Sequence, residues 1–171
     1  MKRTLFLIRH AKSSWNEIAL PDNERPLARR GQRDAPMMGR RLARDKVKPD
    51  LILSSPACRA LSTAHIIADI LHYYRDIVVD ERLYASNTET LLAVVSGLSD
   101  DFNCVMLFGH NPEFLELAHR LSHKLTRMPT CAVIQFTFDA ASWSAIASLK
   151  PARVLFDYPK RNSADDFESL C

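Results

Sequence analysis

The sequence predicts an α/β sandwich of three layers, with helices on both faces of a mainly parallel central sheet. Two observations predict this class. Up to about residue 124, short apolar runs typical of buried parallel strands alternate with segments that have helical apolar spacing. Beyond that point, strand-like segments follow one another without helices between them, so we expect antiparallel C-terminal strands to complete the sheet.

Cap and turn residues divide the chain into its elements. Ser55 followed by Pro56 predicts a helix N-terminus, because Ser is a preferred N-cap and Pro suits the first helical position. Asn111-Pro112 repeats this device, and Gly97 predicts a helix end. Pro36 lies inside the helical segment that is expected to start at about Arg30, so a start nearer residue 35 is the alternative. The expected elements are strand 5–8, helix 30–44, strand 50–53, helix 56–71, strand 76–79, helix 88–97, strand 103–108, helix 112–124 and strands 132–138 and 153–158, with 143–147 as a candidate third.

Composition indicates one globular domain. The chain has 171 residues, of which 47% are hydrophobic and 25% charged, and we expect residues 1–160 to form the domain and residues 161–171 a polar C-terminal tail. No apolar run approaches the roughly 20 residues that span a bilayer, and Arg9 ends the N-terminal run too early for a signal peptide. The four cysteines form no CxxC pair. These features predict a cytoplasmic protein with reduced thiols.

Charge and histidine spacing raise two further questions. A net charge of only +3 does not indicate nucleic-acid binding. Residues 25–48 hold nine Lys or Arg against Asp34 and Asp45, which suits a solvated helix face or, as the alternative, a docking site for an acidic or phosphorylated partner. His119 and His123 are spaced to share a metal, but no acidic third ligand is obvious, so a solvent-facing pair is favoured. We expect no metal, no organic cofactor and neither a membrane nor a nucleic-acid partner.

Arginines and histidines follow three of the predicted parallel strands. Arg9-His10 ends the first strand, Arg59 lies in the first turn of the helix after the second, and His110 follows the strand at 103–108. Because the carboxyl ends of parallel strands line the ligand crevice of open α/β sheets, we expect these side chains to meet. Such cations would repel one another without an anion between them. A phosphoryl group fits, since guanidinium groups bind two of its oxygens and a neutral imidazole can accept it covalently.

Four motifs in order resemble those of the histidine phosphatase superfamily, which also contains the phosphoglycerate mutases. They are Arg9-His10-Ala11-Lys12-Ser13-Ser14-Trp15, Arg25-Pro26-Leu27 with Arg30-Gly31, Ser54-Ser55-Pro56-Ala57-Cys58-Arg59-Ala60 and Gly109-His110-Asn111-Pro112, a variant similar to the SixA-type branch. The resemblance implies a phosphoglycerate mutase-like fold in which His10 is the phosphorylated nucleophile. It also implies that Arg9, Arg59 and His110 surround the phosphoryl group. Asn16 would contact the phosphate, and Arg25 would shape the pocket rim.

One family feature is missing. The mutases and many phosphomonoesterases of the family carry a glutamate that protonates the leaving oxygen, and Ala85 stands where that acid would align. Glu81 or Glu89 could substitute, although neither matches cleanly. A phosphoramidate depends less on such an acid, because its nitrogen can be protonated and imidazole leaves well. The resemblance therefore implies SixA-like hydrolysis of phosphohistidine on a partner protein, such as a histidine phosphotransfer domain.

Other phosphate-handling classes are less compatible with the sequence. It has no G-x-x-x-x-G-K-[ST] loop, and no cysteine is followed by an arginine six positions on, which disfavours P-loop enzymes and cysteine-based phosphatases. Two alternatives remain open. One is a phosphatase or mutase of a small phosphorylated metabolite, which would need a carboxylic acid. The other is a non-catalytic phosphoryl-binding module.

Overall fold

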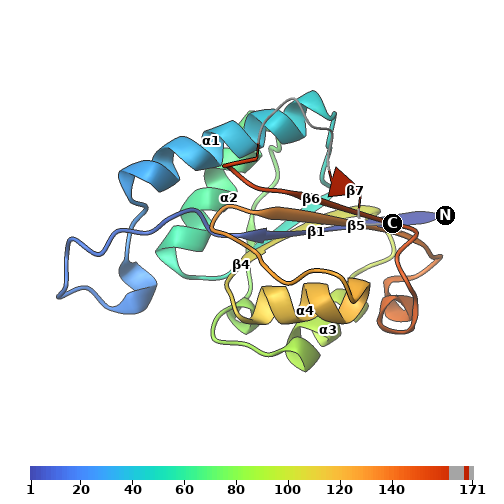
Figure 1. Ribbon diagram of the computed structural model, residues 1–171. Helices are drawn as coiled ribbons and strands as arrows, with labels where there is room; N and C mark the ends of the chain where they lie inside the picture. The colour runs from blue at the N-terminus through green and yellow to red at the C-terminus, as the bar shows by residue number, and fades with distance from the viewer. Residues whose placement is uncertain (162–167, 170–171) are drawn as a thin grey trace.

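The computed structural model (Figure 1) describes residues 1–161 and 168–169, and in these residues one mixed sheet lies between two layers of helices. The strand order is β3-β2-β4-β1-β5-β6-β7; the first four strands in this order run parallel, and the last three are antiparallel to their neighbours. The elements are β1 (Lys2–Arg9), η1 (Asp22–Glu24), α1 (Arg29–Arg44), β2 (Leu51–Ser54), α2 (Cys58–Ile70), β3 (Val78–Val79), η2 (Glu81–Leu83), α3 (Thr88–Ser96), β4 (Cys104–Gly109), α4 (Glu113–Ser122), β5 (Val133–Asp139), η3 (Trp143–Ser148), β6 (Arg153–Asp157) and β7 (Glu168–Ser169), where η denotes a 3-10 helix.

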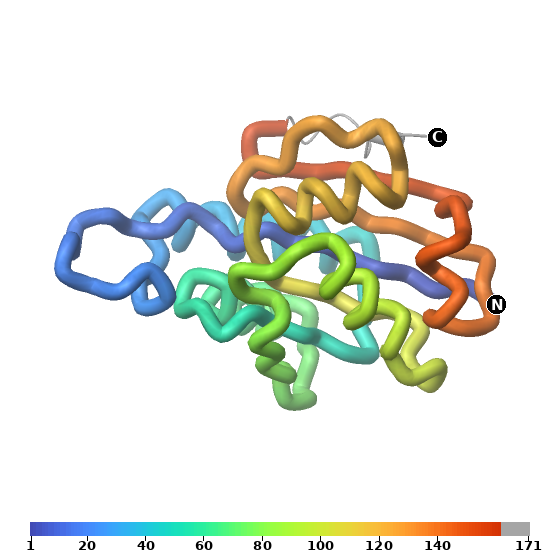
Figure 2. Tube along the Cα trace, turned by 90° about the horizontal axis from the view of Figure 1, so that it is seen from below, coloured from blue at the N-terminus to red at the C-terminus, as the bar shows by residue number. Residues whose placement is uncertain are grey.

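Successive side chains of the central strands enter two different cores. In β1, Leu5 and Leu7 belong to the core shared with α3 and α4, whereas Phe6 and Ile8 belong to the core shared with α1 and α2. A strand buried on both faces must be apolar at every position, which explains the continuous apolar runs of the sequence. Figure 1 shows α1 and α2 on one face, and Figure 2 shows α3 and α4 crossing the other.

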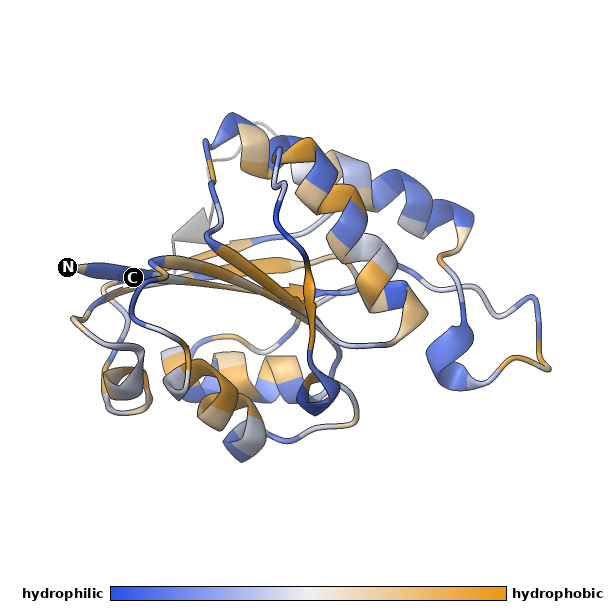
Figure 3. Cartoon of the chain, turned by 180° about the vertical axis from the view of Figure 1, so that it is seen from behind, coloured by the Kyte–Doolittle hydropathy of each residue, from blue (hydrophilic) through white to orange (hydrophobic). Residues whose placement is uncertain are grey.

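The hydropathy colouring agrees with this layering. In Figure 3 the sheet is mostly hydrophobic, while much of the outward surface of the helices is hydrophilic. The predicted three-layer α/β sandwich with antiparallel C-terminal strands is therefore confirmed.

The predicted helix start at about Arg30 is confirmed, whereas the alternative start near residue 35 and the predicted start of the next helix at Pro56 are wrong. α1 begins at Arg29 and continues through Pro36, since its buried face, which includes Met38, packs on the sheet. α2 begins at Cys58 rather than Pro56. The Ser55 hydroxyl still accepts from the backbone N–H of Ala57 at 3.2 Å, as an N-cap does, and it also lies 2.7 Å from a histidine ring of the site described below.

Two further signals also have a different outcome in the structure. The segment 143–147 is a 3-10 helix and not a strand, because Trp143 donates from its backbone to the Asp100 carboxylate and from its indole to the Phe102 carbonyl. Asn111 does not cap α4. Its side-chain amide donates instead to the Met128 carbonyl at 2.9 Å, which joins the loop before α4 to the loop after it.

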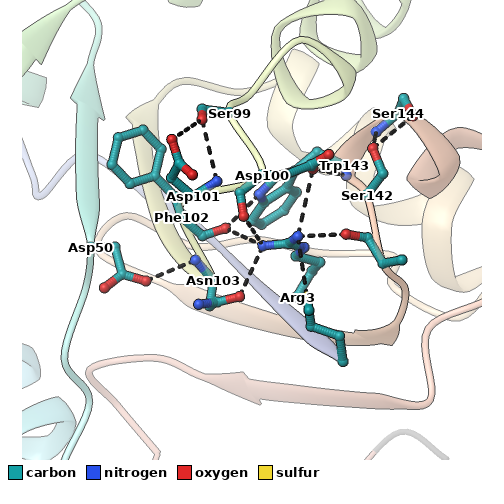
Figure 4. Close-up of polar contacts among 12 residues, drawn as sticks. Arg3, Asp50, Ser99, Asp100, Asp101, Phe102, Asn103, Ser142, Trp143 and Ser144 are labelled. Carbon is teal, nitrogen blue, oxygen red and sulfur yellow. Dashed lines mark hydrogen bonds and ion pairs between the residues drawn. The ribbon is translucent and has the colours of Figure 1, made fainter.

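A buried arginine organises the end of the sheet that lies opposite the site. Arg3 is 1% exposed and donates to the carbonyl oxygens of Asp100 and Phe102 and to the Asn103 side chain at 2.7–2.9 Å (Figure 4). It also donates to the carbonyl of Ala141. These bonds join the start of β1 to the loop before β4 and the loop after β5.

The predicted polar tail, residues 161–171, is described in part. Residues 168–169 form β7, which pairs with Leu155 and Phe156 of β6, so this piece of the tail extends the sheet. Residues 162–167 and 170–171 lie outside the described residues. Of the helices in the described part, none is both long enough and apolar enough to cross a bilayer.

Candidate active site

The carboxyl ends of three parallel strands lie next to one another. β1 and β2 both pair with β4, and His10 follows β1, Ser55 follows β2 and His110 follows β4. The ring centroids of His10 and His110 are 5.2 Å apart. The structure thus brings together two histidines that are separated by most of the α/β portion of the chain, as the strand pattern predicts.

The backbone and the ring of His10 are both fixed. Its backbone N–H donates to the Gly109 carbonyl, and its carbonyl accepts from Cys131, each at 3.0 Å. Its Nδ1 lies 2.7 Å from the carbonyl oxygen of Ala11. Because a carbonyl oxygen only accepts, Nδ1 carries the proton and Nε2 holds a free lone pair in the neutral ring. Burial lowers the pKa of His10 to about 3; the bond to Ala11 opposes this shift, and neighbouring positive groups add to it.

His110 lies between Ser55 and Tyr84. The Ser55 hydroxyl is 2.7 Å from Nε2 of His110, and the centroid of the Tyr84 ring is 5.5 Å from that of the imidazole, edge to face. Burial, reinforced by the charge of Arg59, lowers the pKa of His110 to about 4. Its buried Nδ1 has no hydrogen-bond partner within the described residues. Buried polar atoms without a hydrogen-bond partner are rare in folded proteins and are typical of sites where a ligand, an ion or water is the partner.

Arg59 reaches the site from the first turn of α2 and is held by η1. It donates to the Asp22 carbonyl at 2.6 Å and to the Asp22 carboxylate at 2.9 Å. The Tyr84 hydroxyl donates to the same carboxylate oxygen at 2.9 Å. Burial raises the pKa of Asp22, but hydrogen bonds from Arg59, Tyr84 and Arg25 lower it further, so the pKa lies below its usual value. Asp22 is therefore an ionised counter-ion that orients Arg59.

Arg25 closes the site on the side of the loop after β1. Its guanidinium donates to the Ser13 hydroxyl at 2.6 Å, the Ser14 carbonyl at 3.0 Å and the Asp22 carboxylate at 3.1 Å. Its central carbon lies 3.3 Å from the centroid of the Trp15 ring, a cation–π arrangement. Trp15 itself is 68% exposed, so it presents an apolar surface at the pocket mouth.

A pocket of about 180 Å³ is lined by Arg9, His10, Lys12, Ser13, Trp15, Arg25, Arg59 and Thr130, and His110 lies next to His10 but is not among these described lining residues. Arg9 donates to the Met128 carbonyl at 2.9 Å, while its buried Nε has no partner in the part of the chain that the structure describes. Burial, together with the charge of Arg59, lowers the pKa of Arg9. Four basic side chains around so small a volume suit a tetrahedral oxyanion such as a phosphoryl group.

A glycine sets the course of the loop that follows His10. A Cβ on Gly31 of α1 would collide with the carbonyl oxygen of Lys12, which also accepts from the backbone N–H of Ala28 at 2.8 Å. On the other side of the loop, Ala11 donates to the Thr63 hydroxyl of α2 at 3.0 Å. The Arg30-Gly31 motif therefore has a structural reason: the loop must approach the helix backbone closely.

The predicted site residues separate into two groups. Arg9, His10, Arg25, Arg59 and His110 come together at the strand ends. The others lie elsewhere: Asn16 is exposed and outside the pocket lining, Glu81 is exposed in η2, and Glu89 pairs with Arg120 at 3.1 Å.

Sequence reasoning missed four contributors, Lys12, Asp22, Tyr84 and Thr130, together with the contact from Ser55 to His110. Lys12 lies inside the motif that contains His10, so its place in the motif was a usable signal. Asp22 could have been suspected on charge alone, because clustered arginines need a counter-ion. Nothing local in the sequence marks Tyr84 or Thr130.

Known proteins match parts of this chain in sequence. Residues 5–88 match the histidine phosphatase superfamily (branch 1). Over 158 residues the chain is 30% identical to an uncharacterized chloroplastic protein of Arabidopsis thaliana. The aligned region covers 87% of this chain and 72% of that protein. Over 64 residues it is 39% identical to phosphoglycerate mutase 1 of Saccharomyces cerevisiae. This shorter aligned region covers 36% of this chain and 26% of the mutase.

Solved structures share the fold. The protein histidine phosphatase SixA in complex with tungstate matches with a TM-score of 0.75 and 22% identity, over 91% of this chain and 94% of that one. A mycobacterial glucosyl-3-phosphoglycerate phosphatase matches with a TM-score of 0.62 and 16% identity, over 95% of this chain and 100% of that one. At these identities the likeness concerns the fold, which is phosphoglycerate mutase-like.

Proposed function

The chain belongs to the histidine phosphatase superfamily and is a phosphatase, and on this premise we propose that it hydrolyses phosphohistidine on a partner protein with His10 as the phosphoryl acceptor. The orientation of His10 carries the proposal. Its Nδ1–H donates to Ala11, which leaves the Nε2 lone pair free to attack. A pKa of about 3 keeps this ring neutral at physiological pH.

The reaction has two displacements at phosphorus. First, Nε2 of His10 forms a bond to phosphorus while the P–N bond of the substrate breaks; the electron pair of that bond stays on the substrate nitrogen, and because the other nitrogen of the substrate ring has taken a proton from solvent, the leaving group is neutral imidazole. Second, water attacks phosphorus in phospho-His10, which releases inorganic phosphate and restores the neutral ring. Arg9 and Arg59 stabilise the charge on the equatorial oxygens during both displacements.

The lack of a protonated carboxylic acid among the described residues of the pocket favours phosphohistidine over an ester as the substrate. Among the described residues that line the pocket there is no carboxylic acid, and the adjacent Asp22 is held ionised by Arg59 and Tyr84. An alkoxide leaving group needs a proton donor, which contributes roughly a hundredfold or more. A phosphohistidine ring that is protonated by solvent leaves as neutral imidazole and needs no acid from the protein. The fold shared with SixA, a protein histidine phosphatase, supports the same choice.

A small phosphate ester is the second candidate. The matched segment of the yeast mutase and the fold shared with a glucosyl-3-phosphoglycerate phosphatase favour it. This candidate requires an acid that moves into the pocket, with Glu81 and Glu89 as the residues to test.

A hydrolysis panel distinguishes these functions. Wild type and His10→Ala are given a phosphorylated histidine phosphotransfer domain, free phosphohistidine and a sugar phosphate. The proposal predicts turnover of both phosphohistidine substrates by the wild type alone, with Glu81→Gln and Glu89→Gln fully active. Preference for the ester and its loss in either glutamine variant would support the second candidate. Phosphate binding without any turnover would indicate a non-catalytic module.

A further inference from the structure

A second and larger cavity opens beside the catalytic pocket. It has a volume of about 550 Å³ and lies between α1, the loop before β5 and the residues that follow β6. Arg9, Lys12 and Thr130 line both the cavity and the pocket, so the two adjoin each other. We call this cavity the basic groove, because six of its lining side chains are Lys or Arg: Arg9, Lys12, Arg30, Arg33, Arg127 and Lys160.

The groove has an excess of positive charge that its own acid does not balance. Asp34 is the acidic residue among the described lining residues, and it is 4% exposed. It pairs with Arg33 at 3.3 Å and with Arg30 at 3.8 Å. Within the described residues, Lys12 and Lys160 have no acidic partner.

Arg127, one of the groove cations, contacts an aromatic ring rather than an acid. Arg127 donates to the Tyr158 hydroxyl at 2.9 Å, and its guanidinium lies 4.6 Å from the centroid of that ring. The contact orients the side chain and leaves its charge uncompensated. Met37, Pro129 and Pro159 lie among the cations, so the lining is both basic and apolar.

We propose that the basic groove docks an acidic segment of the phosphoprotein whose phosphohistidine enters the catalytic pocket. The inference rests on the proposed function and adds a surface and a partner chemistry to it. Glutamate and aspartate side chains would meet the cations, and the apolar atoms of the same segment would cover Met37 and the two prolines. A nucleic acid would meet the same charges, but it would not carry a phosphohistidine into the catalytic pocket that the groove adjoins.

The basic stretch at residues 25–48 contributes only some of its cations to the groove. Of the nine Lys or Arg in residues 25–48, only Arg30 and Arg33 line the groove. Arg40 and Lys48 are exposed and lie outside its lining, so they behave as the charges of a solvated helix face, the first of the two interpretations of this stretch. They provide a matched control for charge changes in the groove.

Three peptides test the proposal. Each carries one phosphohistidine, and they differ only in flanking residues, which are glutamate, glutamine or lysine. For each protein, kcat/KM on a peptide is divided by kcat/KM on free phosphohistidine, so changes in the pocket itself cancel. In the wild type at low ionic strength, the ratio should be about tenfold higher for the glutamate peptide than for the glutamine peptide, and lowest for the lysine peptide. High salt should reduce the difference.

The variant Arg127→Glu/Lys160→Glu should abolish or reverse this order. The variant Arg40→Glu/Lys48→Glu, with the same change in net charge, should keep it. Equal ratios for the three wild-type reactions, or an unchanged order in the groove variant, would overturn the proposal. So would stronger inhibition by single-stranded DNA than by polyglutamate of equal charge. A wild type that leaves every phosphohistidine substrate intact would reject the proposed function itself, whereas failure of the groove alone leaves turnover of free phosphohistidine.

Discussion

The two neutral histidines of the site make the fold sensitive to acid. In the folded chain, burial lowers the pKa of His10 to about 3 and that of His110 to about 4, from 6.5. An unfolded chain does not bury them, so both titrate near their usual pKa. Below pH 6.5 the unfolded chain therefore binds more protons than the folded chain, and stability falls as the pH falls, until it levels off near the folded pKa values.

The magnitude follows from the distance between the working pH and the unfolded pKa. Lowering the pH from 7.5 to 5.0 should cost about 2 kcal/mol per histidine, because pH 5.0 lies about 1.5 units below the unfolded pKa and each unit is worth about 1.4 kcal/mol. For His10 and His110 together the cost is about 4 kcal/mol if they act independently. Solvent screening is small, since these side chains belong to residues that are 8% and 6% exposed.

Urea unfolding at the two pH values measures this cost. The wild type is compared with His10→Asn/His110→Asn, which keeps polar side chains of similar reach but cannot titrate, and with the two single variants. The wild type should lose about 4 kcal/mol more than the double variant between pH 7.5 and 5.0, and each single variant should lie halfway. The remaining histidines are common to all four proteins. Equal losses in the wild type and the double variant would refute the lowered pKa values.

Three further changes test separate parts of the structure. Ser55→Ala removes the hydroxyl beside His110, and kcat/KM on free phosphohistidine should fall about tenfold, the equivalent of one hydrogen bond. Gly31→Ala places a methyl group against the Lys12 carbonyl, so kcat/KM should fall about tenfold although circular dichroism shows a folded protein. Arg3→Met removes the hydrogen bonds that the buried Arg3 guanidinium donates to Asp100, Phe102 and Asn103 and should lower the free energy of unfolding in urea by about 3 kcal/mol.

Neighbouring substitutions control for general disruption. Ser54→Ala removes a hydroxyl that donates to a backbone carbonyl, and Gln32→Ala changes an exposed residue beside Gly31, so both should leave kcat/KM closer to the wild-type value. Full activity of Ser55→Ala or Gly31→Ala would contradict the contacts assigned to them. Arg3→Met as stable as the wild type would contradict the organising role of that arginine.

The sequence predicts the layers of the fold because their signals are local. A strand buried on both faces must be apolar throughout, so β1 and β4 can be recognised from their residues alone. The meeting of His10, Arg59 and His110 then follows from a general property of parallel sheets, namely that strand ends share one edge. Helix boundaries were harder to predict. Pro36 costs one backbone hydrogen bond, but the buried face of α1 outweighs it, and that burial depends on the sheet.

The missed parts of the site depend on contacts between distant segments. Asp22 bonds to Arg59 only because the loop that carries η1 folds back over the first turn of α2, and no spacing in the sequence specifies that path. Tyr84 reaches the same carboxylate from the loop after β3. The low pKa values of the two histidines likewise depend on burial, which is a property of the assembled sheet edge rather than of the motifs.

Transfer of the substrate phosphoryl group to Nε2 of His10 is the central claim, and trapping tests it directly. The wild type is mixed with a peptide that carries radiolabelled phosphohistidine and is quenched in alkali, in which a P–N bond survives. Digestion and mass spectrometry then locate the label. We predict that it lies on His10 and is absent from His10→Ala. Label on His110 or on any other residue, or undiminished turnover by His10→Ala, would contradict the claim.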